Sequence, residues 1–343
     1  MSDPSPVASR PAPTAAPRVL LLGATGTIGR ATARALIEAG AEVVCPVRPR
    51  PGRDTAAAAA DLEAALGGAR VRFASVTGRD SLVRDGLCGE RFDAVVSCLA
   101  SRSGAPKDAW AVDYRANLAA LEVAREAGAK VFVLLSAICV QKPLLAFQQA
   151  KLAFETELMA SGLTYAIVRP TAFFKSLSGQ IERVRQGKPF LVFGDGELTA
   201  CKPISDDDLG RYIAACVFDE SRHNQVLPIG GPGPAITPKQ QGEALFRLLG
   251  RSPKFRHVPV ALLDGIIGGL ALAGRLSPKL AEKAEFARIG RYYATQSMLV
   301  LDPATGQYDA DATPSTGSDT LFAYYGRVLT GEATVERGEH SVF

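Results

Sequence analysis

A glycine-rich turn near the start of the chain constrains its fold more than any other feature. Residues 23–29 (GATGTIG) directly follow an apolar run at 19–22 and open an alanine-rich helical pattern at 28–39. In a strand–turn–helix unit, the first glycine permits a tight turn, the second lets backbone amides approach a pyrophosphate, and the third lets the helix pack close to the strand. The positive end of the helix also attracts the anion. The turn therefore predicts a dinucleotide-binding site.

Strand and helix patterns alternate after this turn. Short apolar runs occur at residues 42–47, 71–76, 93–99, 131–136 and 165–169, and helical patterns occur at 55–66, 108–127 and 144–160. The apolar runs are continuous rather than alternating, which indicates that both faces of each strand are covered, as in a parallel sheet between helix layers. Right-handed crossovers then give an α/β fold with a doubly wound parallel sheet, the NAD(P)-binding Rossmann fold.

The regularity weakens after Pro170, which suggests a smaller C-terminal substrate lobe. We predict a disordered tail at residues 1–17, an NADP-binding Rossmann domain at 18–175 and a mainly substrate-binding lobe at 176–343, with one further strand near 226–231 returning to the sheet. The tail holds five prolines and no apolar run, and so resembles neither a signal peptide nor a membrane anchor. The apolar stretch at 258–272 is shorter than the roughly 20 residues of a membrane span. We expect a buried or surface-seeking helix there, or the wall of an apolar pocket.

Charge and cysteine spacing exclude several functions. The 39 Lys and Arg residues against 35 Asp and Glu give a net charge of +4, spread along the chain, which leaves no electrostatic footprint for nucleic acid. The six cysteines include no Cys-x-x-Cys pair, and the three histidines have no metal-ligand spacing. We therefore predict neither an iron–sulfur cluster nor another metal site.

The end of the second predicted strand distinguishes NADP from NAD. An NAD site places a carboxylate there to hold the ribose 2′-hydroxyl. This chain instead has Arg48 and Arg50, and a guanidinium is a bidentate partner for phosphate. We therefore predict NADPH as the cofactor, with both arginines on its 2′-phosphate.

Other predicted cofactor contacts lie at strand ends and on the helix at 144–160. Ser136 ends the fifth strand, and Lys151 is placed to reach the nicotinamide ribose hydroxyls. We predict both as catalytic residues. The full predicted cofactor set is Gly23, Thr25, Gly26, Thr27, Ile28, Gly29, Arg48, Arg50, Cys98, Leu99, Ala100, Ser136, Lys151, Pro170 and Thr171.

These motifs resemble the short-chain dehydrogenase/reductase superfamily, in its extended, atypical branch. The glycine turn, the serine after the fifth strand, Lys151 and the Arg-Pro-Thr after the sixth strand match its plan. Where the superfamily has a tyrosine four residues before the lysine, this chain has Phe147, which has no transferable proton. Either the protein is not a catalyst, or it reduces something other than a simple carbonyl.

Longer segments are similar to the NADPH-dependent divinyl (proto)chlorophyllide 8-vinyl reductases. They lie at 134–143 (LLSAICVQKP), 168–176 (VRPTAFFKS), 192–205 (VFGDGELTACKPIS), 227–233 (LPIGGPG) and 286–303 (FARIGRYYATQSMLVLDP). The resemblance implies an oxidoreductase that converts the 8-vinyl group of a chlorophyll precursor to ethyl, in chlorophyll or bacteriochlorophyll biosynthesis for photosynthesis. Such a reaction forms no alkoxide, so Phe147 would be no loss. Its proton could come from water, Tyr114, Cys139 or Lys151.

A flat, apolar tetrapyrrole with a carboxylate requires a wide apolar cleft and a few cations. Candidate lining residues are Phe147, Phe173, Phe174 and the stretch at 258–272, and candidate cations are Lys142, Lys175 and Arg291. We expect a cytoplasmic protein with peripheral contact to photosynthetic membranes, and we infer no protein partner. The alternatives are a noncatalytic NADP-sensing or assembly protein on the same fold, and a reductase of small phenolic or quinone substrates.

Overall fold

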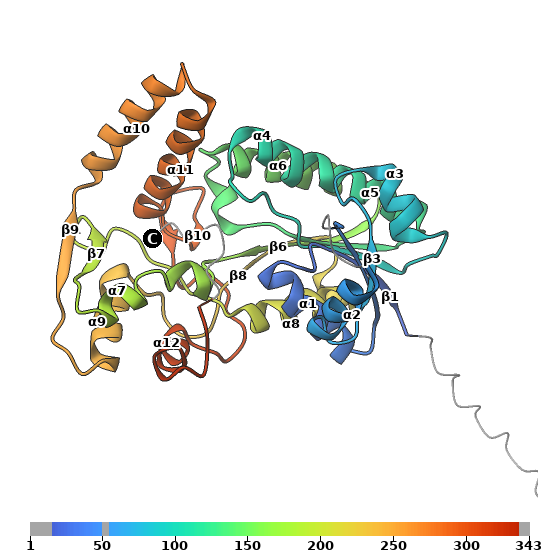
Figure 1. Ribbon diagram of the computed structural model, residues 1–343, viewed down its shortest axis with the longest axis horizontal. Helices are drawn as coiled ribbons and strands as arrows, with labels where there is room; N and C mark the ends of the chain where they lie inside the picture. The colour runs from blue at the N-terminus through green and yellow to red at the C-terminus, as the bar shows by residue number, and fades with distance from the viewer. Residues whose placement is uncertain (1–15, 50–54, 336–343) are drawn as a thin grey trace, which may run out of the picture.

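A seven-stranded parallel sheet forms the centre of the protein (Figure 1). The computed structural model describes residues 16–49 and 55–335, so the predicted tail up to residue 15, and also Arg50, lie outside the described residues. The strand order is β3-β2-β1-β4-β5-β6-β8, and every neighbouring pair is parallel. The strands are β1 (Arg18–Leu22), β2 (Glu42–Val47), β3 (Arg70–Phe73), β4 (Ala94–Ser97), β5 (Val131–Leu135), β6 (Thr164–Pro170) and β8 (Gln225–Ile229). The predicted doubly wound sheet is confirmed.

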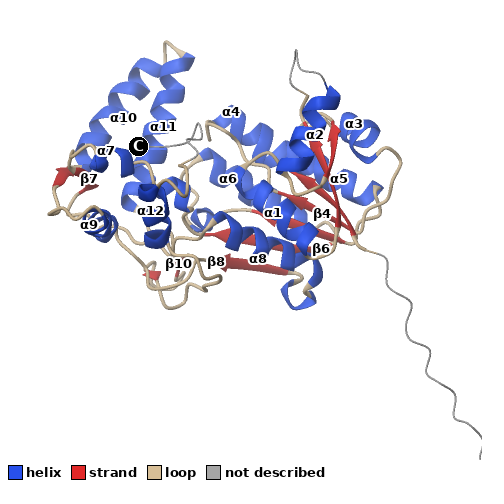
Figure 2. Ribbon diagram, turned by 60° about the horizontal axis from the view of Figure 1, so that its bottom comes forward, coloured by secondary structure: helices blue, strands red, loops and turns tan. Residues whose placement is uncertain are grey.

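Helices cover both faces of the sheet (Figures 1 and 2). One layer contains α1 (Thr27–Glu38), α2 (Thr55–Ala65) and α8 (Asp206–Phe218), and the other contains α3 (Arg79–Ser81), α4 (Pro106–Ala109), α5 (Asn117–Glu126) and α6 (Ala146–Met159). Val19 and Leu21 pack under the first layer, whereas Leu20 and Leu22 pack under the second, and all four are fully buried. This two-sided burial is the reason for the continuous apolar runs in the sequence.

The helix predicted over 108–127 is interrupted by a wider, π-helical segment. This segment, η2 (Trp110–Ala116), separates α4 from α5. π-Helical turns are uncommon and occur frequently at functional sites. A second π-helical segment is η1 (Leu82–Leu87), and η3 (Ile138–Gln141), η4 (Phe174–Leu177) and η5 (Glu220–Arg222) are short 3-10 helices.

A second lobe lies beyond the carboxyl ends of the strands (Figure 2). It contains α7 (Ile181–Arg185), β7 (Phe190–Phe193), α9 (Pro238–Leu248), β9 (Phe255–Val258) and α12 (Leu321–Thr330), which share a core that includes Phe190, Phe246 and Tyr325. The parallel pairing of β7 with β9 was not predicted from the sequence. The predicted boundary at 175/176 stays a prediction; α8 and β8 follow it in the chain but belong to the Rossmann layers.

Two long helices, α10 (Val260–Gly274) and α11 (Pro278–Thr295), form a hairpin that projects from this lobe (Figure 1). A short antiparallel pair, β10 (Val300–Leu301) and β11 (Tyr308–Asp309), follows the hairpin. Within residues 16–49 and 55–335, no helix combines the length and the apolar character of a membrane span.

Candidate active site

A cavity of about 1800 Å³ lies between the sheet and the second lobe. Gly23, Cys98, Ser136 and Thr171, which follow β1, β4, β5 and β6, line one side of the cavity. This is the edge at which open α/β sheets bind ligands. Pockets for one small ligand usually measure about 300–1,000 Å³. The cavity therefore has room for a cofactor and a second ligand of similar size.

The glycine turn forms a cradle that a side chain would fill. Gly23 has a φ of +77°, and a Cβ on it would lie 2.6 Å from the carbonyl oxygen of Cys98. A Cβ on Gly29 would lie 2.1 Å from the carbonyl oxygen of Gly23. The N-cap residue of α1, Gly26, has no side chain to cap the helix, so backbone N–H groups of the first turn remain available to an anion. This geometry fits a dinucleotide pyrophosphate.

The structure brings the predicted cofactor residues together. All of those that lie in the described ranges line the cavity: Gly23, Thr25, Gly26, Thr27, Ile28, Gly29, Arg48, Cys98, Leu99, Ala100, Ser136, Lys151, Pro170 and Thr171. Arg50 lies outside the described residues, so its predicted phosphate contact stays a prediction. Arg30 also lines the cavity and was missed, although it directly follows Gly29 in the motif.

Lys151 is paired with a carboxylate that sequence reasoning missed. Its Nζ lies 3.1 Å from Oδ1 of Asp113, and both residues line the cavity. Asp113 comes from the π-helical segment η2, and its Oδ2 is buried without a hydrogen-bond partner among the described residues. An unpaired buried oxygen costs free energy unless a ligand donates to it. Asp113 and Lys151 therefore offer a bound ligand both an acceptor and donors.

Ser136 is held by a second buried carboxylate. Its Oγ donates a hydrogen bond of 2.5 Å to Oε1 of Glu155, and Arg169 donates to both carboxylate oxygens. Glu155 and Lys151 are one turn apart on α6, so this helix orients both predicted catalytic residues. Because the Ser136 proton points to Glu155, the hydroxyl oxygen can accept a hydrogen bond from the cavity side.

A tyrosine from the hairpin enters the site near Phe147. Tyr293 lines the cavity from α11, and its hydroxyl oxygen lies 3.9 Å from Sγ of Cys139. Phe147, Cys139 and Ile289 pack in one apolar cluster at the same wall. Tyr293 was not predicted, because the sequence does not show which of two adjacent tyrosines faces the cavity.

The Tyr293 hydroxyl and the Cys139 thiol both keep their protons near neutral pH. Tyr293 is 39% exposed as a whole residue, but desolvation of its hydroxyl and the nearby Cys139 raise its pKa above the usual value. Burial likewise raises the pKa of the Cys139 thiol. Tyr292, the adjacent residue, instead donates its hydroxyl to the backbone carbonyl of Cys139 at 2.9 Å. Tyr293 is thus a protonated group that faces the cavity.

Some predicted pigment contacts lie elsewhere. Phe147 and Phe173 line the cavity, but Phe174 does not. Phe174 is 3% exposed and packs against the ring of Tyr324, because adjacent residues at the start of η4 face opposite sides. The apolar stretch at 258–272 is also absent from the lining; most of it forms α10, which packs on the outside of α11.

The predicted cations are also placed differently. Lys175 lines the cavity, but its Nζ donates to Oγ1 of Thr27 at 3.0 Å, on the glycine-turn side. Lys142 lies outside the lining and donates to Gln296, and Arg291 pairs with Asp264 of α10.

Tyr114, an open candidate for the proton donor, does not line the cavity. Its hydroxyl lies 3.5 Å from Oε1 of Glu157. Cys139 and Lys151 remain as candidates from the sequence, and both line the cavity.

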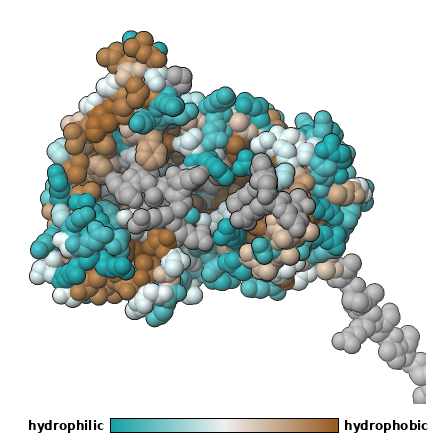
Figure 3. Space-filling model, viewed as in Figure 1, coloured by the Kyte–Doolittle hydropathy of each residue, from teal (hydrophilic) through white to brown (hydrophobic). Residues whose placement is uncertain are grey.

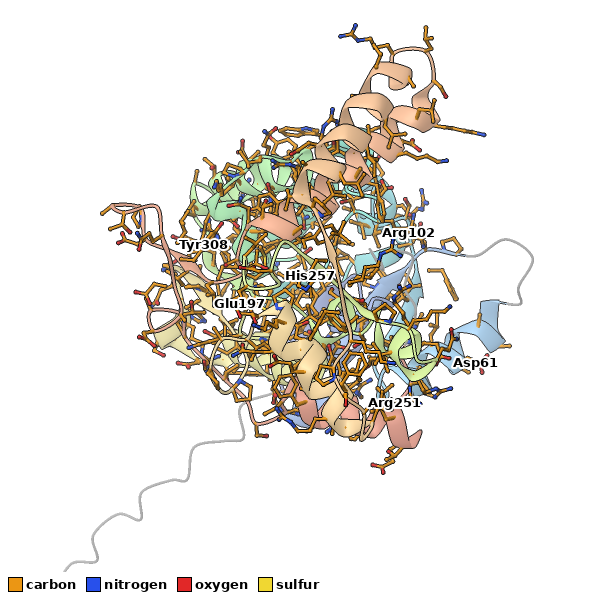
Figure 4. All side chains as sticks on the ribbon, turned by 90° about the vertical axis from the view of Figure 1, so that its left-hand side faces the viewer. Asp61, Arg102, Glu197, Arg251, His257 and Tyr308 are labelled. Carbon is orange, nitrogen blue, oxygen red and sulfur yellow. The ribbon has the colours of Figure 1, made fainter. Side chains whose placement is uncertain are left out.

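Further cations line the cavity and were not predicted. They are Arg102, Arg183, Arg185 and Lys188. Arg102 lies in the loop after β4, whose Gly104 is next to Ile289 of α11. Figure 4 accordingly shows Arg102 on the hairpin side of the protein and Asp61, another lining residue, on α2.

The cysteines do not form a reactive or metal-binding centre in the described part of the chain. All six are free thiols, and burial raises the pKa of Cys98 and of Cys201 to about 12. No group of three or more His, Cys, Asp or Glu side chains capable of holding a metal ion occurs within residues 16–49 and 55–335. Lys151, Ser136 and Tyr293 all line the cavity.

Comparisons with known proteins agree with this geometry. Residues 23–220 match the NAD(P)H-binding family. The NADPH-bound quinone oxidoreductase QOR2 of Escherichia coli has the same fold, with a TM-score of 0.62 at 18% identity over 91% of this chain and 99% of that one. The chain is 51% identical to divinyl chlorophyllide a 8-vinyl-reductase, chloroplastic, of Oryza sativa subsp. indica, over 99% of this chain and 87% of the relative. It is 52% identical to the protein of the same name from Cucumis sativus, over 95% and 79%. The chain therefore belongs to the divinyl chlorophyllide a 8-vinyl-reductase family.

Proposed function

We propose that this protein uses NADPH to reduce the 8-vinyl group of divinyl chlorophyllide a, or of a closely related tetrapyrrole, to an ethyl group. The observation that carries this conclusion is the 51% identity, over 99% of the chain, to a reductase of that name. A cavity with room for both a dinucleotide and a tetrapyrrole agrees with it.

The sheet side of the cavity fits NADPH, which supplies a hydride when it is bound. The amides of the glycine turn receive the pyrophosphate, and Lys175, held against Thr27, adds positive charge there. Arg48 and Arg30, which also line the cavity, bind the 2′-phosphate. Lys151 donates to the nicotinamide ribose, and the unpartnered Oδ2 of Asp113 accepts from it. This division of roles assigns Lys175 to the cofactor rather than to the pigment.

The lobe side of the cavity receives the pigment. Phe147, Phe173, Ile289 and Met298 offer an apolar wall to the macrocycle. Lys188 and the other cations on this side supply positive charge for the pigment carboxylate. The protein positions the vinyl group, and positioning alone accounts for much of the rate in reactions of this kind.

Tyr293 donates the proton that completes the ethyl group. Reduction of a vinyl group to ethyl adds one hydride and one proton, and a protonated side chain that faces the pigment can supply the proton. Tyr293 faces the cavity, and its raised pKa keeps it protonated. The Tyr293 hydroxyl comes from α11 and lies at the same cavity wall as Phe147. It takes the role of the superfamily tyrosine whose position Phe147 occupies in this chain.

We also place the protein in the cytoplasm, in peripheral contact with photosynthetic membranes. The support is the apolar outer face of the α10–α11 hairpin, on the lobe that holds the pigment (Figure 3).

One experiment tests the function. Purified protein is incubated with NADPH and divinyl chlorophyllide a, without ferredoxin or flavin, and the pigment is separated by chromatography. We expect the 8-ethyl product and a Soret band shifted to the blue. Binding of NADPH without pigment turnover would support the noncatalytic sensor instead. Reduction of a small quinone, with the pigment unchanged, would support the quinone reductase.

A further inference from the structure

The α10–α11 hairpin has an apolar outer face that no described part of the chain covers. None of the α10 residues is buried. Leu262, Ile266 and Leu272 are 55%, 44% and 66% exposed, and Leu276, in the turn after α10, is 93% exposed. Figure 3 shows this surface as a brown band along the projecting hairpin. Large exposed apolar surfaces of this kind usually mark a contact with a partner or a membrane.

The outer face is not required for packing the hairpin. Successive helical residues turn by about 100°, which places Leu262, Ile266 and Leu272 on one side of α10. Gly274 lies on the opposite side, against α11, where a Cβ on it would lie 2.9 Å from Cα of Ala281. The outer leucines and isoleucine are therefore free to contact something other than this chain.

The outer face also does not line the pigment cavity. Phe286, Ile289 and Tyr293, the larger apolar and aromatic residues that the hairpin contributes to the cavity, all come from α11. The hairpin thus has one side on the cavity and another open to solvent.

Positive charge lies next to the apolar face. Arg275, Lys279 and Lys283 are exposed at and after the turn of the hairpin, together with one exposed acid, Glu282, and none of the three cations forms an ion pair with a residue in the described ranges. The charge of Asp264, in contrast, is neutralised by Arg291. An apolar helix beside unpaired cations is complementary to a bilayer with anionic lipids. Two copies packed through this face would bring their cations together, which disfavours self-association.

We propose that the α10–α11 hairpin docks the protein onto the surface of an anionic lipid bilayer. Leu262, Ile266, Leu272 and Leu276 enter the boundary between headgroups and acyl chains, and the cations contact the lipid phosphates. The 15 residues of α10 are fewer than the roughly 20 needed for a span, so the helix lies along the interface. This proposal rests on the proposed function: docking places the α11 wall of the pigment cavity next to the lipid, and an apolar pigment dissolves in that lipid.

Vesicle flotation tests the docking surface. The full chain is mixed with phosphatidylcholine vesicles, with and without one-third phosphatidylglycerol, and centrifuged through a density gradient. We expect flotation with the anionic vesicles. Ile266→Glu should weaken binding at least tenfold, because it removes an apolar group that would enter the bilayer and puts a negative charge on the protein, which the anionic lipid repels. Phe218→Glu, at the end of α8 in the Rossmann layers, is the matched control, since Phe218 is 41% exposed and Ile266 is 44% exposed.

A second variant separates charge from apolar contact. Lys279→Glu should weaken binding about fivefold or more at low salt, and the difference should shrink at high salt, where charges are screened. Equal flotation of the parental chain and Ile266→Glu, or no flotation of the parental chain, would overturn the proposal. A lipid-free dimer that Ile266→Glu converts to a monomer would also overturn it and assign the face to a second copy.

Turnover of detergent-dispersed pigment distinguishes this proposal from the proposed function. Ile266→Glu should keep parental turnover in detergent while it loses flotation. Flotation of a parental chain that does not reduce the pigment would support the docking surface and contradict the reductase function.

Discussion

Lys151 and Asp113 form an ion pair inside the cavity, with Nζ and Oδ1 3.1 Å apart and only 10% and 1% of the two side chains exposed. The carboxylate fixes the ammonium group at one point, so the remaining N–H donors of Lys151 are available to a ligand. A buried pair of this kind also affects the stability of the fold, because removal of one partner leaves the other charge buried without a counter-charge.

Lys151→Met should lower turnover more than it weakens pigment binding. It should also reduce the free energy of unfolding by about 3–5 kcal/mol, since Asp113 would then be buried without a counter-charge. The double variant Lys151→Met/Asp113→Leu should regain much of the stability but none of the turnover. Thermal unfolding and steady-state kinetics on both variants check this. Parental kinetics in Lys151→Met would show that the lysine has only a structural role.

Arg48→Ala should weaken NADPH binding by about 1.5–3 kcal/mol, the usual contribution of a hydrogen bond to a charged group. NADH binding should change little, because NADH has no 2′-phosphate. Fluorescence titration with both cofactors measures the difference. Arg34→Ala is the control, since Arg34 lies on α1 outside the cavity lining and pairs with Asp207. An equal loss for NADPH and NADH would contradict the assignment of Arg48.

Tyr293→Phe should lower turnover by about 100-fold or more, the usual contribution of a general acid, while pigment binding changes little. Tyr292→Phe is the matched control: it removes the hydrogen bond to the Cys139 carbonyl and should cost about 1 kcal/mol of stability but little turnover. Because the pKa of Tyr293 is raised, its proton persists as the pH rises past the usual tyrosine value, and turnover should not fall on this account. If Tyr293→Phe turned over the pigment at the parental rate, the proton donor would instead be Cys139, Lys151 or water.

Glu90 should make folding stability depend on acid pH. Arg72 and then Arg18 lower the pKa of Glu90 from 4.5 to about 2. A lowered pKa stabilises the fold above pH 4.5, and this contribution is lost as the pH falls from 4.5 towards 2. Glu90→Gln should therefore be less stable than the parental chain at neutral pH. The difference in the free energy of unfolding should be about 1 kcal/mol or less, because the ion pairs of Glu90 are partly exposed. This difference should disappear in acid. Urea unfolding at several pH values measures it. Asp80→Asn, at a 94% exposed side chain, is the control.

The sheet could be predicted from the sequence because its signals are local. The central strands β1, β4 and β5 are continuous, buried runs of mostly apolar residues, and the glycine turn lies between β1 and α1. The pairing of β7 with β9 could not be predicted. Each strand has only four residues, and the two strands, which are far apart in the sequence, meet only when the lobe folds. Its reason is packing: Phe190 and Phe255 meet in the lobe core with ring centroids 6.1 Å apart.

The site was partly predictable for the same reason. Residues that follow strands, such as Ser136 and Cys98, must meet at one edge of a parallel sheet. Asp113 and Tyr293 reach the cavity through tertiary packing of η2 and α11, which no local pattern specifies. Phe173 and Phe174 show what the sequence could not predict. Both are aromatic, but only the fold determines that Phe173 lines the cavity and Phe174 packs in the lobe core.

The most direct test of the account follows the hydride. The purified protein is given divinyl chlorophyllide a and NADPH that carries deuterium at the transferable C4 position of the nicotinamide, and the product is analysed by mass spectrometry and NMR. The account predicts one deuterium in the new 8-ethyl group, with no requirement for ferredoxin or flavin. An 8-ethyl product without deuterium, or no product while NADPH still binds, would contradict it.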